Sequence, residues 1–417
     1  MATTPQCKDN FRLDSAEGFR YLARQPILDM RGRLHGYELL FRDEPGACFP
    51  WDGNRATRTM LDNSVVFGLE KLTGGALAFV NCTEESLTGA LVDVLPAGMT
   101  VLEILEDLEP TPVLVSACRR LKRAGFRLAL DDFTWKPGIE PLVELADYIK
   151  IDFLAVDAHE RKLLLDRLSY RAVALVAEKV ETSEQFKTAC DEGFTLVQGY
   201  HFCRPVMLRN RKIPANRLSQ IEILCALQDE TADLRNISRL VKRDTSLTYR
   251  ILRLINSPMY AVQQEVRSVE GALVVIGEDA FRRVATLAIT SDLNAGQNQE
   301  VLRLALVRGR FCELAARVYG LNPTEQYLVG MLSLLPAMLR IPMDELTPSL
   351  PLREEIRQAL NDAESPVRGL LAWVIANEQG DWTLCSQTAR RWSMDSAPLQ
   401  RCYAQAIVWA ESVLHFA

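Results

Sequence analysis

The sequence predicts an α/β barrel followed by an all-α helical domain, and three observations lead to this prediction. The chain has 417 residues, which is too long for one typical core and favours two or more domains. In the first half, short apolar runs alternate with longer amphipathic stretches, a pattern typical of parallel strands joined by crossover helices. From Leu218 onward, apolar residues recur every three or four positions, which indicates helices.

The first half contains eight strand candidates. They cover residues 21–28, 34–41, 76–82, 100–105, 126–132, 148–152, 172–178 and 194–200. The amphipathic stretches between them cover residues 55–72, 111–124, 157–168 and 183–192. Eight such strands predict a TIM-like barrel, in which the first two runs form an antiparallel hairpin joined at "DMRGR".

The second half is divided by turn residues at Ser257-Pro258, Gly277 and Asn322-Pro323. A basic stretch with prolines at residues 204–216 separates it from the first half. We therefore expect three parts along the chain. They are an N-terminal extension at residues 1–18, a barrel domain at 19–208 and a helical domain at 209–417.

Composition places the chain among soluble globular proteins, with 48% hydrophobic and 24% charged residues. A formal net charge of −6 gives no support for a surface that coats nucleic-acid polymers or adheres to membranes. Ten scattered cysteines without a C-x-x-C pair favour buried thiols over disulfides or a zinc site. The N-terminus lacks a signal-peptide pattern and no apolar run reaches membrane-spanning length, so we expect a cytoplasmic protein.

Polar residues stand where the predicted strands end, and functional groups of such barrels gather at that end. In chain order they are Glu38, Asn81, Glu103, Asp131, Asp132, Lys150, Asp152, Glu178, Glu181 and Gln198. A single acidic residue at a strand end is more often a loop start or a solvated group than a ligand. As a set, however, converging carboxylates would repel each other without cations, and hard divalent ions prefer such oxygens. The set predicts a metal site.

The first half resembles EAL domains, the barrel phosphodiesterases of cyclic di-GMP. Eight motifs match in order over about residues 20–206. They are "RQPIL", "YELLFR", "FVNCT", "LEILE", "LDDF", "YIKID", "VAEKVET" and "VQGYHFCRP". The resemblance therefore implies a metal-dependent nucleotide site, with Mg²⁺ or Mn²⁺ as the cofactor and cyclic di-GMP as the ligand.

The resemblance also implies a role for each matched residue. The metal ligands would be Glu38, Asn81, Glu103 and Asp131 for one ion, with Asp131, Asp132 and Glu181 near a second. Asp152 also belongs to the predicted metal set. Lys150 would stabilise the attacking water or the phosphate charge, and Glu178 would orient or deprotonate the water. Gln25, Arg42 and Gln198 would contact the nucleotide.

Three departures from the EAL pattern weigh against turnover. Residues 134–138 replace the Gly-Thr-Gly loop that follows Asp-Asp-Phe in active members and couples metal binding to substrate binding and dimer contacts. Lys179 replaces a glycine and places a long cation beside two metal-site glutamates. Leu105 replaces a threonine, so a hydroxyl is lost beside the site. We expect binding of nucleotide or metal with weak or no hydrolysis.

The second half resembles the HDOD domain, a helical relative of HD phosphohydrolases found in bacterial signalling proteins. The markers are Asp244, "SLTYRILRLINS", Tyr260, "RSVEGAL" and Gly277. HD enzymes hold their metal with several His and Asp residues, yet none of the four histidines lies between residues 202 and 414. The helical half is therefore expected to bind an unknown signalling protein and not to hydrolyse a substrate.

Three functions stay open at this point. The chain is a signalling protein that binds cyclic di-GMP, a working phosphodiesterase that yields linear pGpG, or a non-catalytic scaffold. EAL domains paired with HDOD domains form a recognisable group, usually described as degenerate in the EAL site, and this favours the first. A homodimer is compatible with every one of these functions.

Four arginines of the helical half raise the alternative of an anion site, namely Arg250, Arg253, Arg282 and Arg283. Exposed faces of amphipathic helices are the commoner explanation for such residues.

Overall fold

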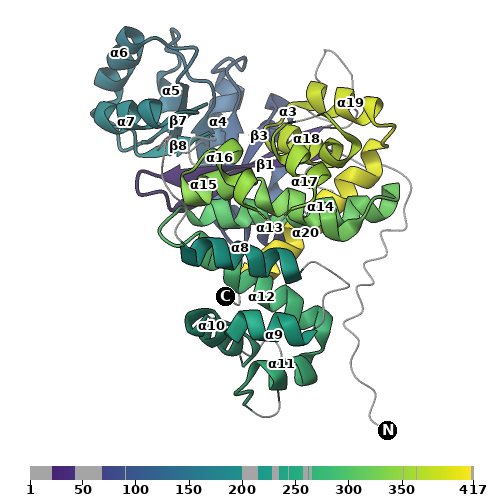
Figure 1. Cartoon of the computed structure of the whole chain (residues 1–417). Helices are drawn as coiled ribbons and strands as arrows, with labels where there is room; N and C mark the ends of the chain where they lie inside the picture. Colours follow the sequence, from purple (N-terminus) through teal and green to yellow (C-terminus); the bar gives the residue numbers. More distant parts are fainter. Residues whose placement is uncertain are drawn as a thin grey trace.

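The first half of the chain forms a closed barrel of eight strands in the order β1 to β8 (Figure 1). The computed structural model describes residues 21–42, 68–89, 91–199, 215–227, 234–242, 244–256, 262, 265–350, 352–362 and 364–414. The strands are β1 (Tyr21–Asp29), β2 (Leu34–Arg42), β3 (Leu77–Cys82), β4 (Thr100–Ile104), β5 (Arg127–Leu130), β6 (Tyr148–Asp152), β7 (Ala174–Glu178) and β8 (Leu196–Gln198). The predicted barrel is confirmed.

The barrel is irregular at its start, as expected. β1 runs antiparallel to both of its neighbours, β2 and β8, whereas all other neighbouring strands are parallel. The carboxylate of Asp29 forms the hairpin turn because its Oδ1 accepts the backbone N–H groups of Arg31 and Arg33, each at 2.9 Å. Gly32 supplies the left-handed backbone of this turn, with φ of 75°.

Alternation of side chains along the strands builds two cores. One residue from each of seven strands fills the barrel interior, namely Ile27, Phe79, Val101, Ala129, Tyr148, Val176 and Leu196. Residues of opposite parity, such as Val80, Leu102 and Ile149, face the surrounding helices. The interior is therefore a packed core, and polar side chains can gather only at its ends.

Helices cover the outside of the barrel. They are α2 (Leu69–Thr73), α3 (Glu84–Thr88), α4 (Pro112–Arg123), α5 (Glu140–Val143), α6 (Ala158–Leu168) and α7 (Ser183–Glu192), with 3₁₀ turns at Val92–Val94 and Ala97–Met99. Local signals start several of them: Thr182 and Gln185 form a capping box at α7. Most of the helix expected at residues 55–72 lies outside the described residues.

The second half is all-α, as predicted, over the residues that the structure describes. Its helices are α8 (Ala215–Leu227), α9 (Leu234–Lys242), α10 (Thr245–Ile255), α11 (Val269–Ile276), α12 (Glu278–Leu293), α13 (Gln299–Tyr319), α14 (Pro323–Leu332), α15 (Leu335–Leu339), α16 (Met343–Leu346), α17 (Glu354–Leu360), α18 (Pro366–Glu378), α19 (Trp382–Arg391) and α20 (Ser396–Leu414), with a 3₁₀ turn at Thr347–Ser349. Helix α13 packs on α14, α18 and α20. None of the described helices combines the length and the apolar character that crossing a membrane requires.

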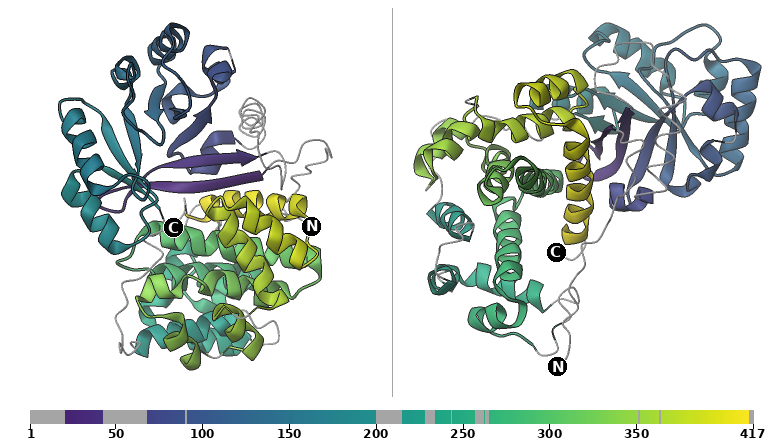
Figure 2. Two further views of the ribbon diagram at one scale, coloured as in Figure 1. Left: turned by 90° about the horizontal axis from the view of Figure 1, so that it is seen from above. Right: turned by 90° about the vertical axis from the view of Figure 1, so that its right-hand side faces the viewer.

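The β1–β2 hairpin is shared between the two halves. Figure 2 shows the hairpin lying between the remaining barrel strands and the last helices of the chain. Helices α18 and α20 pack directly against β1, and one hydrophobic cluster continues from the barrel's outer face into the helical half. The expected domain boundary near residue 208, and the extension at 1–18, lie outside the described residues.

Candidate functional site

The polar residues predicted at the strand ends converge on one mouth of the barrel. The register places Glu38 of β2 opposite Gln25 of β1, and Asn81 of β3 beside Glu103 of β4. The antiparallel course of β1 is what brings Gln25 to the same end as Glu38. Parallel pairing of the other strands aligns their carboxyl ends, so that residues from all eight strands or their following loops meet there.

The ammonium of Lys150 is the centre of this mouth. Its Nζ lies 2.7 Å from Glu103 Oε1 and 2.7 Å from Asp131 Oδ1. It also lies 2.9 Å from Glu178 Oε1 and 3.1 Å from Glu38 Oε2. Lys150 and Glu103 have no exposed side-chain surface, which strengthens these interactions because little solvent screens them.

One ammonium cannot balance three buried carboxylates and the partly buried Asp131, and the pKa shifts show the imbalance. Burial raises the pKa of Glu103 well above its usual value, with Glu38 and Asp131 adding to the shift against the opposing effect of Lys150. Burial likewise raises the pKa of Glu178 to about 8. Burial opposes the charge of Lys150, but the surrounding carboxylates outweigh it and raise the pKa of Lys150 well above its usual value. The mouth therefore has an excess of acidic groups, which favours protons or cations there.

The donor set fits a hard divalent cation. One carboxylate oxygen from each of Glu38, Glu103 and Asp131 lies within 4.8 Å of the others. Glu103 Oε2 and Asn81 Oδ1 are buried and accept no hydrogen bond from any described residue. Oxygen ligands that are buried and without a donor are the kind that Mg²⁺ or Mn²⁺ would satisfy.

Glu38 is held in place by amides on both sides. Asn81 Nδ2 donates to its Oε1 at 3.2 Å, and Gln198 Nε2 donates to its Oε2 at 2.6 Å. Burial disfavours the charged form of Glu38, but Lys150 and these hydrogen bonds prevail and lower the pKa of Glu38. Gln198 Nε2 also donates to Gln25 Oε1 at 3.0 Å, so two of the predicted nucleotide contacts touch each other.

Steric crowding explains why a glycine follows Gln198. Gly199 has φ of 144°, and a Cβ there would lie 2.1 Å from the carbonyl oxygen of Val180. The amide of Val180 donates to Gln198 O at 3.0 Å, which joins the end of β8 to the loop after β7. Glycine at this position therefore allows the close approach that places Gln198 at the mouth.

A second group of charges lies beside the first. Lys179 Nζ pairs with Asp152 Oδ2 and lies 3.8 Å from Asp132 Oδ1. The structure thus brings the ammonium of Lys179 to two aspartates. Asp152 is further engaged by the backbone N–H groups of Leu154 and Ala155. Lys179 and Asp132 both have left-handed backbones, with φ of 57° and 38°, a conformation that is costly for non-glycine residues.

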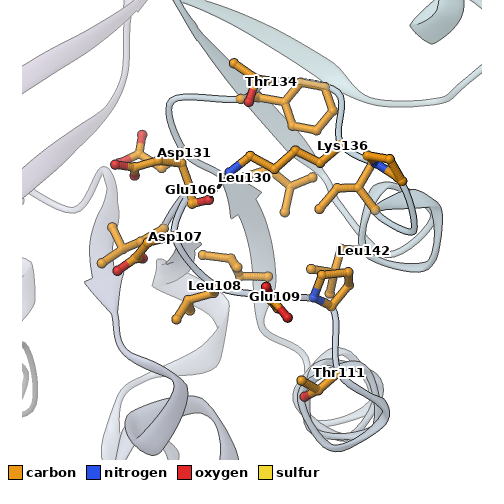
Figure 3. A pocket seen from close by; sticks show the side chains of 16 residues that line it. Glu106, Asp107, Leu108, Glu109, Thr111, Leu130, Asp131, Thr134, Lys136 and Leu142 are labelled. Atoms are coloured by element: carbon orange, nitrogen blue, oxygen red, sulfur yellow. Dashed lines mark hydrogen bonds between the residues drawn. The ribbon is translucent and has the colours of Figure 1, made fainter.

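The altered loop after Asp132 closes onto the neighbouring loop. Lys136 Nζ donates to the carbonyl oxygen of Glu106 at 2.6 Å. Between the two loops lies a cavity of about 550 Å³, and Figure 3 shows Asp131, Thr134 and Lys136 around it with Asp107 on the facing side. The cavity adjoins the carboxylate group through Asp131, so a ligand at the mouth has room on this side.

Two predicted site residues are not placed at the cluster. The side chain of Arg42 lies outside the described residues. Glu181 belongs to the loop after β7, where its backbone N–H donates to Gln185 Oε1 at 2.8 Å, and its carboxylate is not part of the three-carboxylate group. Both assignments remain predictions. Sequence reasoning missed Gln379 of the helical half, whose carbonyl oxygen accepts from Gln25 Nε2 at 2.9 Å, because no motif marks it.

The markers of the helical half have structural roles. Asp244 caps α10 by accepting the N–H of Leu247 at 2.9 Å. Asn256 exchanges two hydrogen bonds with the backbone of Val266, each at 2.8 Å. Two of the four arginines considered as an anion site pair with carboxylates, Arg250 with Asp292 and Arg282 with Glu278. These pairs favour the simpler explanation of charged helix surfaces.

Comparisons with known proteins agree with both halves. A family model of the EAL domain matches residues 84–205, and one of the HDOD domain matches residues 213–379. The "Uncharacterized protein YuxH" of Bacillus subtilis is 33% identical over 405 residues, which cover 94% of this chain and 98% of that protein. The "Cyclic di-GMP phosphodiesterase CdgJ" of Vibrio cholerae is 31% identical over 400 residues, which cover 94% of this chain and 93% of that protein.

Among solved structures, the FimX EAL domain from Pseudomonas aeruginosa bound to c-di-GMP matches with 21% identity and a TM-score of 0.37. The match covers 44% of this chain and 89% of that one. The two full-length relatives and the two domain matches, in the order seen in the fold, lead to one conclusion. The chain belongs to the family of proteins that join an EAL domain to an HDOD domain.

Proposed function

We propose that the barrel half binds cyclic di-GMP together with a divalent cation at its mouth, and hydrolyses the nucleotide slowly or not at all. The helical half mediates interaction with a signalling protein. The observation that carries this proposal is the group of four carboxylates around Lys150, because these residues match the EAL motifs and keep a cation-binding arrangement.

Each residue at the mouth has a part in the proposal. Glu38, Asn81, Glu103 and Asp131 would hold the cation, which when bound would supply Lewis-acid activation of a phosphodiester. Lys150 would offset negative charge on the phosphate, and Glu178 would accept a proton from a nearby water. The amides of Gln25 and Gln198 would contact the nucleotide, and Arg42 would pair with its phosphate.

Weak turnover is favoured by the charges on the Asp132 side of the mouth. Lys179 places its own ammonium against Asp132, which is predicted near a second ion, and against Asp152, another member of the predicted metal set. A cation of the protein in that position disfavours a second metal by electrostatic repulsion. The loop at 134–138 contacts Glu106 through Lys136 and does not supply the hydroxyl and glycine pattern of active members.

A working phosphodiesterase is the second candidate. It is favoured by the Vibrio cholerae relative, which is named a cyclic di-GMP phosphodiesterase and matches this chain over nearly its whole length. A scaffold without nucleotide binding is the third. In a scaffold, the buried oxygens Glu103 Oε2 and Asn81 Oδ1, which accept no hydrogen bond from any described residue, would have no ligand to interact with.

Two measurements on the full chain separate these functions. Calorimetric titration with cyclic di-GMP in the presence of Mn²⁺ should show binding, and the absence of heat at high micromolar nucleotide would leave only the scaffold. Hydrolysis to the linear dinucleotide is then followed by chromatography in wild type and Glu38→Ala. Fast turnover that Glu38→Ala abolishes would establish the phosphodiesterase instead of the binding protein. The proposal expects binding that Glu38→Ala weakens and turnover near the uncatalysed background.

A further inference from the structure

The helical half closes an edge of the barrel that the barrel's own strands leave open. β8 pairs with β1 only over Ile27–Asp29, so the earlier part of β1 has no described strand on that side. There the N–H of Leu22 donates to Gln400 Oε1 at 3.2 Å, and its C=O accepts from Asn377 Nδ2 at 3.0 Å. Gln400 Nε2 donates to Asn377 Oδ1 at 2.6 Å, which fixes both amides. Two side chains of the helical half thus satisfy the strand edge as a neighbouring strand would.

Buried charges hold the two halves together next to this edge. Arg24 of β1 donates to Glu411 Oε1 at 2.8 Å and to the carbonyl oxygen of Leu72 at 2.6 Å. Tyr37 of β2 donates to Glu300 Oε2 at 2.7 Å. Arg24, Tyr37 and Glu300 are all buried. Separation of the halves would break these charge-assisted hydrogen bonds, so they hold the hairpin against the helical half.

This rigid contact sets the orientation of a mouth residue. Gln25 Nε2 donates to the backbone carbonyl oxygen of Gln379 at 2.9 Å, and Gln25 Oε1 accepts from Gln198 Nε2 at 3.0 Å. A carbonyl oxygen can only accept, so the Gln25 amide must turn its NH₂ group toward the helical half and its oxygen toward Gln198. The other N–H of the same Gln198 nitrogen donates to Glu38 Oε2, so this contact with the carboxylate group does not require Gln25.

We infer that Gln379 and Gly380, at the end of α18, are positioning residues for the nucleotide site. The carbonyl of Gln379 selects one orientation of the Gln25 amide, and through Gln198 it determines which donors and acceptors the mouth presents to the nucleotide. This inference rests on the proposed binding of cyclic di-GMP. It makes the site a composite of both halves, so that nucleotide affinity, but not cation affinity, depends on a turn of the helical half.

Gly380 offers a way to move this carbonyl. Its φ is +71°, and a Cβ at this position would lie 3.0 Å from Leu40 Cδ1 and 3.7 Å from Gln25 Nε2. An alanine there would lie closer to Leu40 Cδ1 than side chains normally tolerate, so the turn or the Leu40 side chain must shift by a few tenths of an ångström. A shift of the turn lengthens the hydrogen bond between Gln25 and Gln379.

Gly320 provides a matched control. It follows α13 as Gly380 follows α18, and its φ of +67° is nearly the same. No heavy atom lies within 4 Å of the position that its Cβ would take. Alanine at either position therefore causes similar backbone strain, but only Gly380→Ala acts on the hairpin.

The test titrates cyclic di-GMP and, separately, Mn²⁺ into the full-length wild type, Gly380→Ala and Gly320→Ala. We expect Gly380→Ala to bind the nucleotide about fivefold more weakly, which corresponds to about 1 kcal/mol, the size of one hydrogen bond. Its Mn²⁺ affinity should equal that of wild type, and Gly320→Ala should match wild type for both ligands. If Gly380→Ala does not fold by circular dichroism, Gly380→Asn replaces it, because asparagine tolerates the left-handed backbone and still carries a Cβ.

Four results would overturn the inference. Equal nucleotide affinity of wild type and Gly380→Ala refutes the positioning role and leaves the proposed function intact. An equal loss in Gly320→Ala, or a parallel loss of Mn²⁺ affinity in Gly380→Ala, shows a general distortion. Absence of nucleotide binding by the wild type itself refutes the proposed function, and the positioning role with it.

Discussion

Replacement of Arg24 by methionine tests whether the hairpin joins the two halves into one unit. The variant removes a buried guanidinium that donates to Glu411 and to the Leu72 carbonyl. Breaking a buried ion pair costs about 3–5 kcal/mol. Glu411 retains Arg303, whose Nε donates to it at 2.9 Å, so its charge is still compensated. We therefore expect a loss at the lower end, about 3 kcal/mol of unfolding free energy.

The matched control is Arg33→Met on the same hairpin. Arg33 pairs with Asp29 at 2.7 Å, but its side chain is 69% exposed. The substitution should therefore lower the free energy of unfolding by about 0.5 kcal/mol or less. Urea unfolding of the full chain, followed by circular dichroism and tryptophan fluorescence, measures the stability loss of each variant. Wild type should unfold in one transition seen by both probes. The reasoning fails if the two variants lose equal stability, or if wild type shows separate transitions for the two halves.

Three further predictions concern the mouth and the barrel's other end. Lys150→Met leaves four carboxylates without their shared cation and should lower the melting temperature by roughly 10 °C, with partial recovery on addition of Mn²⁺ in a thermal-shift assay; a melting temperature that Mn²⁺ leaves unchanged would argue against a cation site. Lys179→Gly should raise Mn²⁺ affinity roughly tenfold in calorimetry, because a repelling charge is removed; unchanged affinity would show that Lys179 does not oppose the cation. Burial, with Arg127 nearby, lowers the pKa of His35 below its ordinary 6.5, so the native state binds fewer protons than the unfolded state and the unfolding free energy should fall as pH drops from 7 toward 5. The urea midpoint should depend less on pH over this range in His35→Gln than in wild type, and a His159→Gln control should keep the wild-type dependence. Equal pH dependence in wild type and His35→Gln would contradict the assignment.

Local pattern was enough to predict the elements and the position of the site. Short apolar runs indicated the strands, and their separation by helical stretches indicated the barrel, because parallel strands need crossover connections. Once the barrel is assumed, the carboxyl ends of its strands share one face. Glu38, Glu103 and Asp131, distant in sequence, could therefore be expected within one cluster, as the structure shows.

The pairing of charges inside that cluster could not be predicted in the same way. The sequence placed Lys179 beside Glu178 and Glu181, and the left-handed backbone of its turn directs the ammonium to Asp152 and Asp132. A side chain's partner depends on backbone angles within its own loop and on the neighbouring loop. Neither is encoded in the spacing of apolar residues.

By itself, the sequence determined a barrel with an acidic mouth, an all-α second half and the absence of histidine ligands there. Only the tertiary structure decided that the second half completes the open edge of β1 and reaches the mouth through Gln379 and Gln25. These two residues are 354 positions apart, and neither half carries a local signal for the contact. The physical reason is that periodicity records which face of an element is buried, whereas the partner of that face is decided by packing of the whole chain.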